Sequence, residues 1–368
     1  MTHALLYSAL TRLRTVSTAR RAELFEDESL LMELREGRGL SNLHPALRQA
    51  VGDLDWAEAE RQDLEIIAKG ASLLCWKDSV YPEGLRNLAD PPPALYVRGD
   101  ISLLSKPSIA LVGSRLSTVY GQNVARSLGE DLARAGLVVV SGLARGVDSA
   151  AHEGALAVEG GTIAVLGTGI DRVYPRENVD LFEKILRRQG AIISEYPPGT
   201  PPLARNFPVR NRIIAGLSIG VVVVEATERS GSLITARLAL EGGKELFAVP
   251  HNITSGTGIG PNTLIQGGAK LVQRLEDVLE ELPAKVRENL TKELLTAPEK
   301  GAGTISENAG CLLKALKSDE GLTVDELCLA TGLSPREILP AALELQMAGM
   351  CVELPGARYA RGKLTKEL

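Results

Sequence analysis

Short apolar runs alternate with amphipathic segments through the middle of the chain. Between the first two runs, Val124, Leu128, Leu132 and Ala135 recur at helical spacing. Apolar strands that alternate with helices are typical of a parallel sheet covered on both faces. We therefore predict an α/β domain over residues 71–290, with a Rossmann-like, doubly wound and mainly parallel sheet. The predicted strands are residues 109–112 (IALV), 137–140 (LVVV), 162–166 (TIAVL), 191–194 (AIIS), 219–224 (IGVVVV), 245–249 (ELFAV) and 270–272 (KLV).

The segment before this domain has a helical pattern. Leucines recur at helical spacing within residues 1–70, and Asp55 is placed to cap a helix that ends near Gly70. We predict a small N-terminal helical domain there, of the SAM or helix-hairpin-helix kind. Residues 81–100 (YPEGLRNLADPPPALYVRGD) are expected to form an extension before the first strand of the sheet.

The C-terminal part predicts a third unit. Residues 291–308 are expected to form a linker. Beyond it, two capping-box patterns occur, and the segment CVELPGARYARG is typical of a hairpin. Three helices followed by a hairpin predict a winged helix-turn-helix domain over residues 309–368. The capping pairs are Thr323 with Glu326 and Ser334 with Glu337.

Composition narrows the class of protein. The longest apolar run near the sheet, residues 219–226, is far shorter than the roughly 20 residues that span a bilayer, and the N-terminal residues show no secretory pattern. Four scattered cysteines are expected to be reduced, and the four histidines lack metal-ligand spacing. We therefore expect a cytoplasmic protein without a metal. Because the net charge is −5, any nucleic-acid site has to be local.

The loops after the predicted strands carry the candidate chemistry. The C-terminal ends of parallel strands meet at one edge of a sheet, where ligands bind. Glycine lets the backbone approach a ligand, and hydroxyls and helix-starting N–H groups bind anionic oxygens. These loops predict a phosphate-binding edge. Its candidate residues are Gly113, Ser114, Arg115, Gly142, Arg145, Gly146, Gly167, Gly169, Ser230, Gly231 and Ser232.

A further loop, residues 204–216 (ARNFPVRNRIIAG), concentrates positive charge. Arg205, Arg210 and Arg212 lie near Phe207 and Asn211, without an acidic residue to offset them. Distributed guanidinium groups suit a repeated phosphate backbone, and an aromatic ring that stacks on a base contributes about 1–3 kcal/mol. This loop predicts a site for single-stranded nucleic acid. The sequence contains no P-loop motif, and no G-x-G-x-x-G motif follows the first strand. ATP hydrolysis and dinucleotide redox chemistry therefore have no support from motifs.

Several polar residues have two interpretations. Asp148 and His152 form either an acid–base pair or a helix cap and scaffold, and we expect the second. Glu195 is either a general base or an arginine partner, and again we expect the second. Tyr174-Pro175 is expected to form a fixed turn more than a binding element. Arg212 is a ligand contact or a structural ion pair, and the sequence leaves that choice open.

The succession of motifs resembles the DNA-processing protein A (DprA/Smf) family over residues 80–275. The matching elements are G-S-R at 113–115, S-G-x-A-x-G-x-D-x-x-A-H at 141–152, G-x-G-x-x-x-x-Y-P-x-x-N at 167–178, S-E-x-P-x-G-x-x-P at 194–202, F-P-x-R-N-R-x-I-A-G-L-S at 207–218 and S-G-S-L-x-T-A at 230–236. One departure is His251, which follows Ala-Val-Pro where many relatives have glycine.

This resemblance implies a protein of natural transformation and competence that is not an enzyme and needs no cofactor. It implies a homodimer that binds and protects incoming single-stranded DNA, loads the recombinase RecA onto it and helps displace single-strand-binding protein. On the family pattern, Arg115 and residues 210–212 hold phosphates, and Phe207 contacts a base. Gly113, Ser114, Gly142, Gly167 and Gly169 shape the pocket.

Two other functions remain as alternatives. Rossmann-like phosphoribohydrolases use P-G-G-x-G-T-x-x-E, but the corresponding turn here is RSGSLITARLA, with Leu238 at the position of the catalytic Glu. A DNA-dependent regulator would act through the winged helix, whose second capped segment, residues 334–349, carries one Arg and two Glu. Recognition helices normally bring positive charge to DNA, so this alternative is disfavoured.

Overall fold

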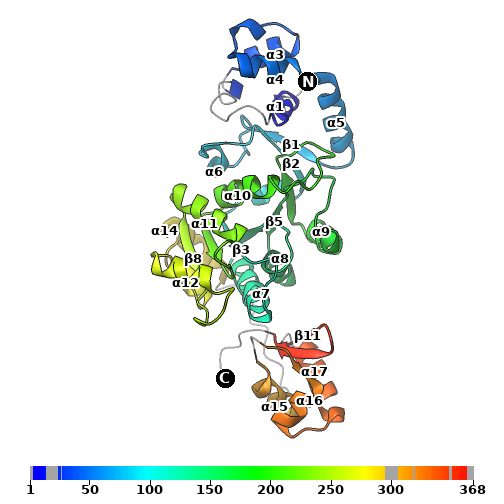
Figure 1. Cartoon of the computed structure of the whole chain (residues 1–368), viewed down its shortest axis with the longest axis vertical. Coiled ribbons are helices and arrows are strands. Elements are labelled where there is room, and N and C mark those ends of the chain that lie inside the picture. Colours follow the sequence, from blue (N-terminus) through cyan, green and yellow to red (C-terminus); the bar gives the residue numbers. More distant parts are fainter. Residues whose placement is uncertain are drawn as a thin grey trace.

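The computed structural model describes residues 3–13, 24–25, 27–294, 306–317, 320–347 and 350–362. An N-terminal helical unit, a central α/β unit and a C-terminal unit of helices and strands follow one another along the long axis of the molecule (Figure 1). None of the described helices is long and apolar enough to cross a membrane.

The N-terminal unit consists of α1 (His3–Leu10), α3 (Glu28–Arg35), α4 (Pro45–Gly52) and α5 (Trp56–Ala68). As predicted, the Asp55 carboxylate caps α5, accepting the N–H of Glu58 at 2.9 Å. Tyr7, Leu31 and Leu47 form a core that also contains Cys75 and Ala94 of the first two strands, so this unit packs against one end of the central sheet.

The central sheet has nine strands in the described part of the chain, in the order β1-β2-β6-β5-β4-β3-β7-β8-β9. The seven strands from β3 to β9 pair in parallel and correspond to the seven predicted runs, so the predicted doubly wound α/β fold is confirmed. The strands are β1 (Ser72–Cys75), β2 (Ala94–Gly99), β3 (Ser108–Val112), β4 (Val138–Ser141), β5 (Thr162–Val165), β6 (Ala191–Ser194), β7 (Gly220–Val223), β8 (Glu245–Ala248) and β9 (Lys270–Leu271).

The sequence did not predict β1 and β2. Part of the expected extension, residues 94–99, instead forms β2, which pairs antiparallel with β6 and carries β1 on its other edge. The residues from Ala94 to Val97 are fully buried. Ala94 packs with the N-terminal helices, whereas Leu95 and Val97 belong to the core of the central unit. The cover of Ala94 comes from a different part of the chain, so the short run ALYV gave no local sign of it.

Helices cover both faces of the sheet, and β3 shows why. Ile109 and Leu111 pack with residues of α7 (Val119–Arg134) and α8 (Val147–Ala157). Ala110 and Val112 point the other way, toward α10 (Asn206–Leu217) and α11 (Gly231–Glu241). Successive side chains of a strand alternate between faces, so a continuous apolar run requires two covering layers. The remaining helices of this unit are α6 (Glu83–Arg86), α9 (Val179–Arg187), α12 (Ile259–Gln266), α13 (Leu275–Leu279) and α14 (Ala284–Leu294).

The strand order changes direction at β3, whose neighbours are β4 on one side and β7 on the other. The connections that leave these strands diverge there and open a crevice beyond their C-terminal ends. The fold thus places the loops after β3, β4 and β7 around one depression.

The C-terminal unit is the expected winged helix. It contains α15 (Glu307–Ala315), α16 (Val324–Thr331), α17 (Pro335–Met347) and a sheet in the order β10-β12-β11. These strands are β10 (Leu322–Thr323), β11 (Cys351–Leu354) and β12 (Arg358–Arg361).

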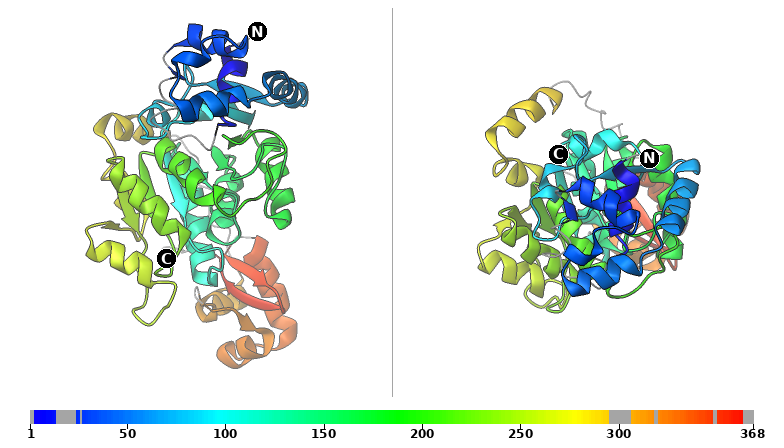
Figure 2. Two further views of the ribbon diagram at one scale, coloured as in Figure 1. Left: turned by 45° about the horizontal axis from the view of Figure 1, so that its top comes forward. Right: turned by 90° about the horizontal axis from the view of Figure 1, so that it is seen from above.

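Both predicted capping pairs form contacts in this unit. Thr323 and Glu326 make a reciprocal capping box, whereas the Glu337 carboxylate accepts both the N–H and the hydroxyl of Ser334. The hairpin of β11 and β12 lies beside α7, where Asn123 Nδ2 donates to the Arg361 carbonyl at 2.7 Å (Figure 2). The predicted linker, residues 291–308, lies mostly outside the described residues, and residues 291–294 belong to α14 instead.

Candidate functional site

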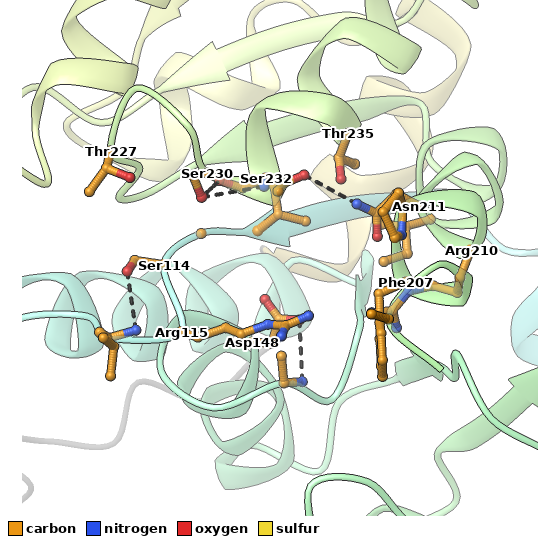
Figure 3. A pocket seen from close by; sticks show the side chains of 18 of the residues that line it. Ser114, Arg115, Asp148, Phe207, Arg210, Asn211, Thr227, Ser230, Ser232 and Thr235 are labelled. Atoms are coloured by element: carbon orange, nitrogen blue, oxygen red, sulfur yellow. Dashed lines mark hydrogen bonds between the residues drawn. The ribbon is translucent and has the colours of Figure 1, made fainter. Parts of the chain in front are cut away.

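A cavity of about 760 Å³ opens at the C-terminal ends of the parallel strands (Figure 3). Loops that follow six strands, β3 through β8, contribute to its lining. The loops after the parallel strands therefore lie together at one edge of the sheet, as predicted. Among the lining residues are nine of the predicted site residues: Gly113, Ser114, Arg115, Phe207, Arg210, Asn211, Ser230, Gly231 and Ser232.

Arg115 presents an open guanidinium group at this cavity. It follows β3, its side chain is exposed, and no ion pair or hydrogen bond of its guanidinium is found among the described residues. Its Cζ atom lies 5.1 Å from the centre of the Phe207 ring, within range of a cation–π interaction. The turn that carries Arg115 is fixed from both ends. Ser114 Oγ accepts the N–H of Leu116, and the buried Glu225 carboxylate accepts the N–H of Thr118 at 2.8 Å.

Arg210 also lines the cavity, but it is 3% exposed and forms part of the scaffold. Its guanidinium donates to the carbonyls of Gly142, at 2.8 Å, and Val165. Its Nε is buried without a hydrogen-bond partner in the described part of the chain. Burial lowers the pKa of Arg210 to about 10, an effect opposed by the nearby Asp148 carboxylate, so the group is still charged at neutral pH.

Asp148 stabilises the loop between β4 and α8, which also contacts Arg210. Its carboxylate accepts the N–H groups of Gly142 and Ala144 at 3.1 and 3.3 Å. It therefore stabilises the loop before α8, as the expected scaffold role requires, although it does not cap the first turn of that helix. Burial raises the pKa of the Asp148 carboxyl, and the positive charge of Arg210 opposes that rise.

Gly142 and Gly167 leave room for the side chains of Arg210 and Phe207. A Cβ atom on Gly142 would lie 2.6 Å from the Arg210 guanidinium, and one on Gly167 would lie 2.8 Å from Cδ1 of Phe207. Neither glycine lines the cavity, so both shape it from the layer beneath. Any side chain at either position would push a lining residue out of place.

The first turn of α11 forms the opposite wall. Ser230 is its N-cap residue, and its hydroxyl is hydrogen-bonded to the Ser232 hydroxyl at 2.8 Å. Asn211 ties α10 to this turn because its Nδ2 donates to the Gly231 carbonyl at 3.2 Å. The N-terminal end of a helix carries partial positive charge, so this wall favours an anionic group.

Arg212 corrects the sequence prediction most clearly. It does not line the cavity; its side chain is buried against Glu195, with N–O distances of 2.7 and 3.0 Å, and lies 3.5 Å from Asp90. Glu195 is thus an arginine partner, which was the interpretation we expected. The pKa of Arg212 is raised, because its two carboxylate partners outweigh the effect of burial.

The other predicted residues outside the lining are Arg145, Gly146, Gly169 and Arg205. Arg145 forms an exposed ion pair with Glu177. Gly146 has a φ of +75°, a backbone conformation that side chains rarely adopt, and its position leaves no room for one beside the Ser114 carbonyl. Arg205 is exposed, directly before the first residue of α10.

Tyr174, for which the sequence favoured a fixed turn over a binding element, lines the cavity. It follows β5, joins its neighbour through a cis Tyr174–Pro175 peptide bond, and its ring centre lies 5.4 Å from that of Phe207. Its position in the glycine-bearing loop after a predicted strand was the available signal. Thr227, Thr235 and Thr257 also line the cavity without having been proposed.

His152 and His251 both make contacts within the scaffold. His152 is buried, its Nδ1 lies 2.7 Å from Thr162 Oγ1, and burial lowers its pKa to about 3. His251, the departure from the family pattern, packs edge-on against Tyr120 and has Nε2 2.7 Å from the Val224 carbonyl. Within the described residues, no group of three His, Cys, Asp or Glu side chains is arranged to hold a metal.

Comparison with known sequences identifies the same family that the motifs resemble. The family model of the DNA recombination-mediator protein A matches residues 72–283, and that of the DprA winged helix domain matches residues 296–357. Protein Smf of Escherichia coli is 41% identical over 305 residues, covering 79% of this chain and 80% of that protein. DNA processing protein DprA of Bacillus subtilis is 39% identical over 276 residues, covering 72% and 93% respectively.

Two solved structures are similar to this chain over most of their own length. DNA processing protein A from Streptococcus pneumoniae has a TM-score of 0.60 and 35% identity, and the match covers 77% of this chain and 99% of that one. DNA processing protein A from Helicobacter pylori, described for its single-stranded DNA binding mode, has a TM-score of 0.52 and 32% identity. That match covers 60% of this chain and 96% of the other.

Proposed function

Since the chain belongs to the DNA recombination-mediator protein A family, we propose that it binds single-stranded DNA in the cavity at the end of β3. It protects the incoming strand and loads RecA onto it during natural transformation, acting as a cytoplasmic homodimer that exchanges the strand with single-strand-binding protein. The relatives named as DNA-processing proteins, and the neighbour described for single-stranded DNA binding, support this role.

One observation carries the proposal. Arg115, whose guanidinium has no ion pair or hydrogen bond among the described residues, lies over an aromatic ring and follows the strand where the sheet order reverses, facing the N-terminal turn of α11. A buried arginine with a structural role is instead paired with a carboxylate, as Arg212 is with Glu195. An exposed cation, a helix N-terminus and an aromatic ring around one cavity suit a phosphate and the base attached to it.

Phosphate contacts come from two walls of the cavity in this proposal. Arg115 supplies a forked donor on one wall, and the Gly231–Ser232 turn supplies hydroxyl and backbone groups on the other, while Arg210 holds the loops beneath them in place. Phe207 supports the Arg115 guanidinium, and an aromatic ring at the cavity contacts a base. Because these contacts address the sugar–phosphate backbone, the affinity depends little on nucleotide sequence.

The phosphoribohydrolase alternative has little support from the side chains at the site. Glu195 is committed to Arg212, and Asp148 to two loop amides. Leu238, at the spacing where those enzymes carry their catalytic Glu, lies within α11 and packs against the core. We therefore propose a protein that binds and transfers DNA without chemical turnover.

A binding titration tests this function. Fluorescence anisotropy with a labelled oligothymidylate should show affinity that falls with salt, at a log–log slope of about −0.7 for each phosphate contacted. A duplex of the same length serves as the competitor. Salt-independent binding, or preference for the duplex, would refute the proposal. Consumption of NAD or a mononucleotide by the purified protein would support the enzyme alternative instead.

A further inference from the structure

We propose that Tyr174 is the surface on which a DNA base stacks in this site. The inference rests on the proposed binding of single-stranded DNA and deepens it, because it names the group that receives the base. Tyr174 is 40% exposed and lines the cavity. Of the tyrosines in the described residues, Tyr7, Tyr81, Tyr96, Tyr196 and Tyr359 are buried, and Tyr120 is half-buried in contact with His251.

Phe207, the aromatic residue that the sequence suggests first, is already in contact on several sides. The Arg115 guanidinium lies over its ring at 5.1 Å, and that of Arg210 lies 6.0 Å from the ring centre. The backbone of Gly167 packs so closely against the ring that a Cβ there would collide with it. A base that reaches Phe207 must therefore displace Arg115, the cation that the phosphate needs.

Tyr174 has no such cover. Its ring is tilted by 42° from that of Phe207, with 5.4 Å between the ring centres, so the two rings touch without lying face to face. Among the described residues, its hydroxyl makes no hydrogen bond and no cation lies over its ring. The Tyr174 ring is therefore open to the cavity, where a planar apolar group can lie against it.

The arrangement separates two tasks. Phe207 holds Arg115, which binds a phosphate, and the adjacent ring of Tyr174 remains open for a base of the same strand. A stacked base contributes to affinity whatever its identity, since every base has a π face. The site thus gains binding free energy from bases without reading their sequence.

The test compares Tyr174→Leu with Tyr174→Phe on two probes of equal length, an oligothymidylate and an oligomer of abasic sites. Tyr174→Leu should weaken oligothymidylate binding by about 5- to 150-fold, the range of one aromatic–base contact. It should leave binding of the abasic oligomer unchanged, because the phosphate contacts remain. Tyr174→Phe keeps the ring and should behave as the wild type on both probes.

Val179→Ala is the matched control, since Val179 is 43% exposed, lies close in sequence and does not line the cavity. Thermal unfolding confirms that each variant is folded. Equal losses on both probes, or no loss on oligothymidylate, would overturn the role of Tyr174 while leaving the proposed function intact. A wild-type protein that binds neither probe would instead refute the proposed function itself.

Discussion

Arg210→Ala should lower the stability of the protein, whereas Arg115→Ala should lower its affinity for DNA, although both arginines line the same cavity. Arg210→Ala removes the donor to two buried carbonyls, those of Gly142 and Val165, and the positive charge nearest to the buried Asp148. A hydrogen bond from a charged group contributes about 1.5–3 kcal/mol, and stranding a buried partner costs about 3–5 kcal/mol. We expect a loss of about 3–5 kcal/mol in the free energy of unfolding.

Arg115→Ala removes a side chain that pairs with no carboxylate among the described residues, so its effect on unfolding should stay within about 0.5 kcal/mol. Its cost appears in binding instead. Loss of one phosphate contact should reduce the log–log salt slope by about 0.7 and lower oligothymidylate affinity by about 10- to 150-fold.

Urea unfolding followed by circular dichroism measures the first quantity, and anisotropy titrations at several salt concentrations measure the second. At about 2–4 °C per kcal/mol for a domain of this size, Arg210→Ala should also lower the melting temperature by roughly 6–20 °C. An Arg210→Ala protein as stable as the wild type would show that this arginine does not support the loops. An Arg115→Ala protein with an unchanged salt slope would remove Arg115 from the phosphate contacts.

Three further predictions concern the groups beneath the cavity. Gly167→Ala should weaken single-stranded DNA binding and cost about 1–3 kcal/mol of stability, because its Cβ would lie 2.8 Å from the Phe207 ring; unchanged affinity and stability would contradict this packing. Glu195→Gln should destabilise the protein by about 3–5 kcal/mol in urea unfolding by leaving Arg212 buried without its main partner. Should that variant instead retain full stability and abolish a nucleotide turnover, Glu195 would be catalytic. His152, whose pKa burial lowers to about 3 from an unfolded value near 6.5, binds a proton more readily in the unfolded chain. Its contribution to stability is therefore complete above about pH 6.5 and is lost by up to about 1.4 kcal/mol per pH unit as the pH falls toward 3. The stability difference between wild type and His152→Gln should follow that pH dependence in urea unfolding, and a difference independent of pH would contradict it.

The sequence predicted the parts of the fold that depend on local pattern. Seven apolar runs became the parallel strands β3 to β9, and Asp55 and Thr323 cap the helices that follow them. The position of the site also followed, because the C-terminal ends of parallel strands necessarily share one edge. Strands β1 and β2 escaped prediction because part of their cover comes from the separate N-terminal helices.

The tertiary structure alone decided what each side chain at the site does. Arg210 and Arg212 are neighbours in one cationic run of the sequence, but two residues of a helix point about 200° apart. Arg210 therefore turns to the carbonyls of Gly142 and Val165 at the ends of β4 and β5, and Arg212 turns to Glu195 and Asp90. Within the described part of the chain, Arg115 has no ion-pair partner, and Tyr174 is exposed beside a covered Phe207. Burial and pairing depend on groups far away in the chain, such as Gly142, which lies 68 residues before Arg210, and no local pattern contains that information.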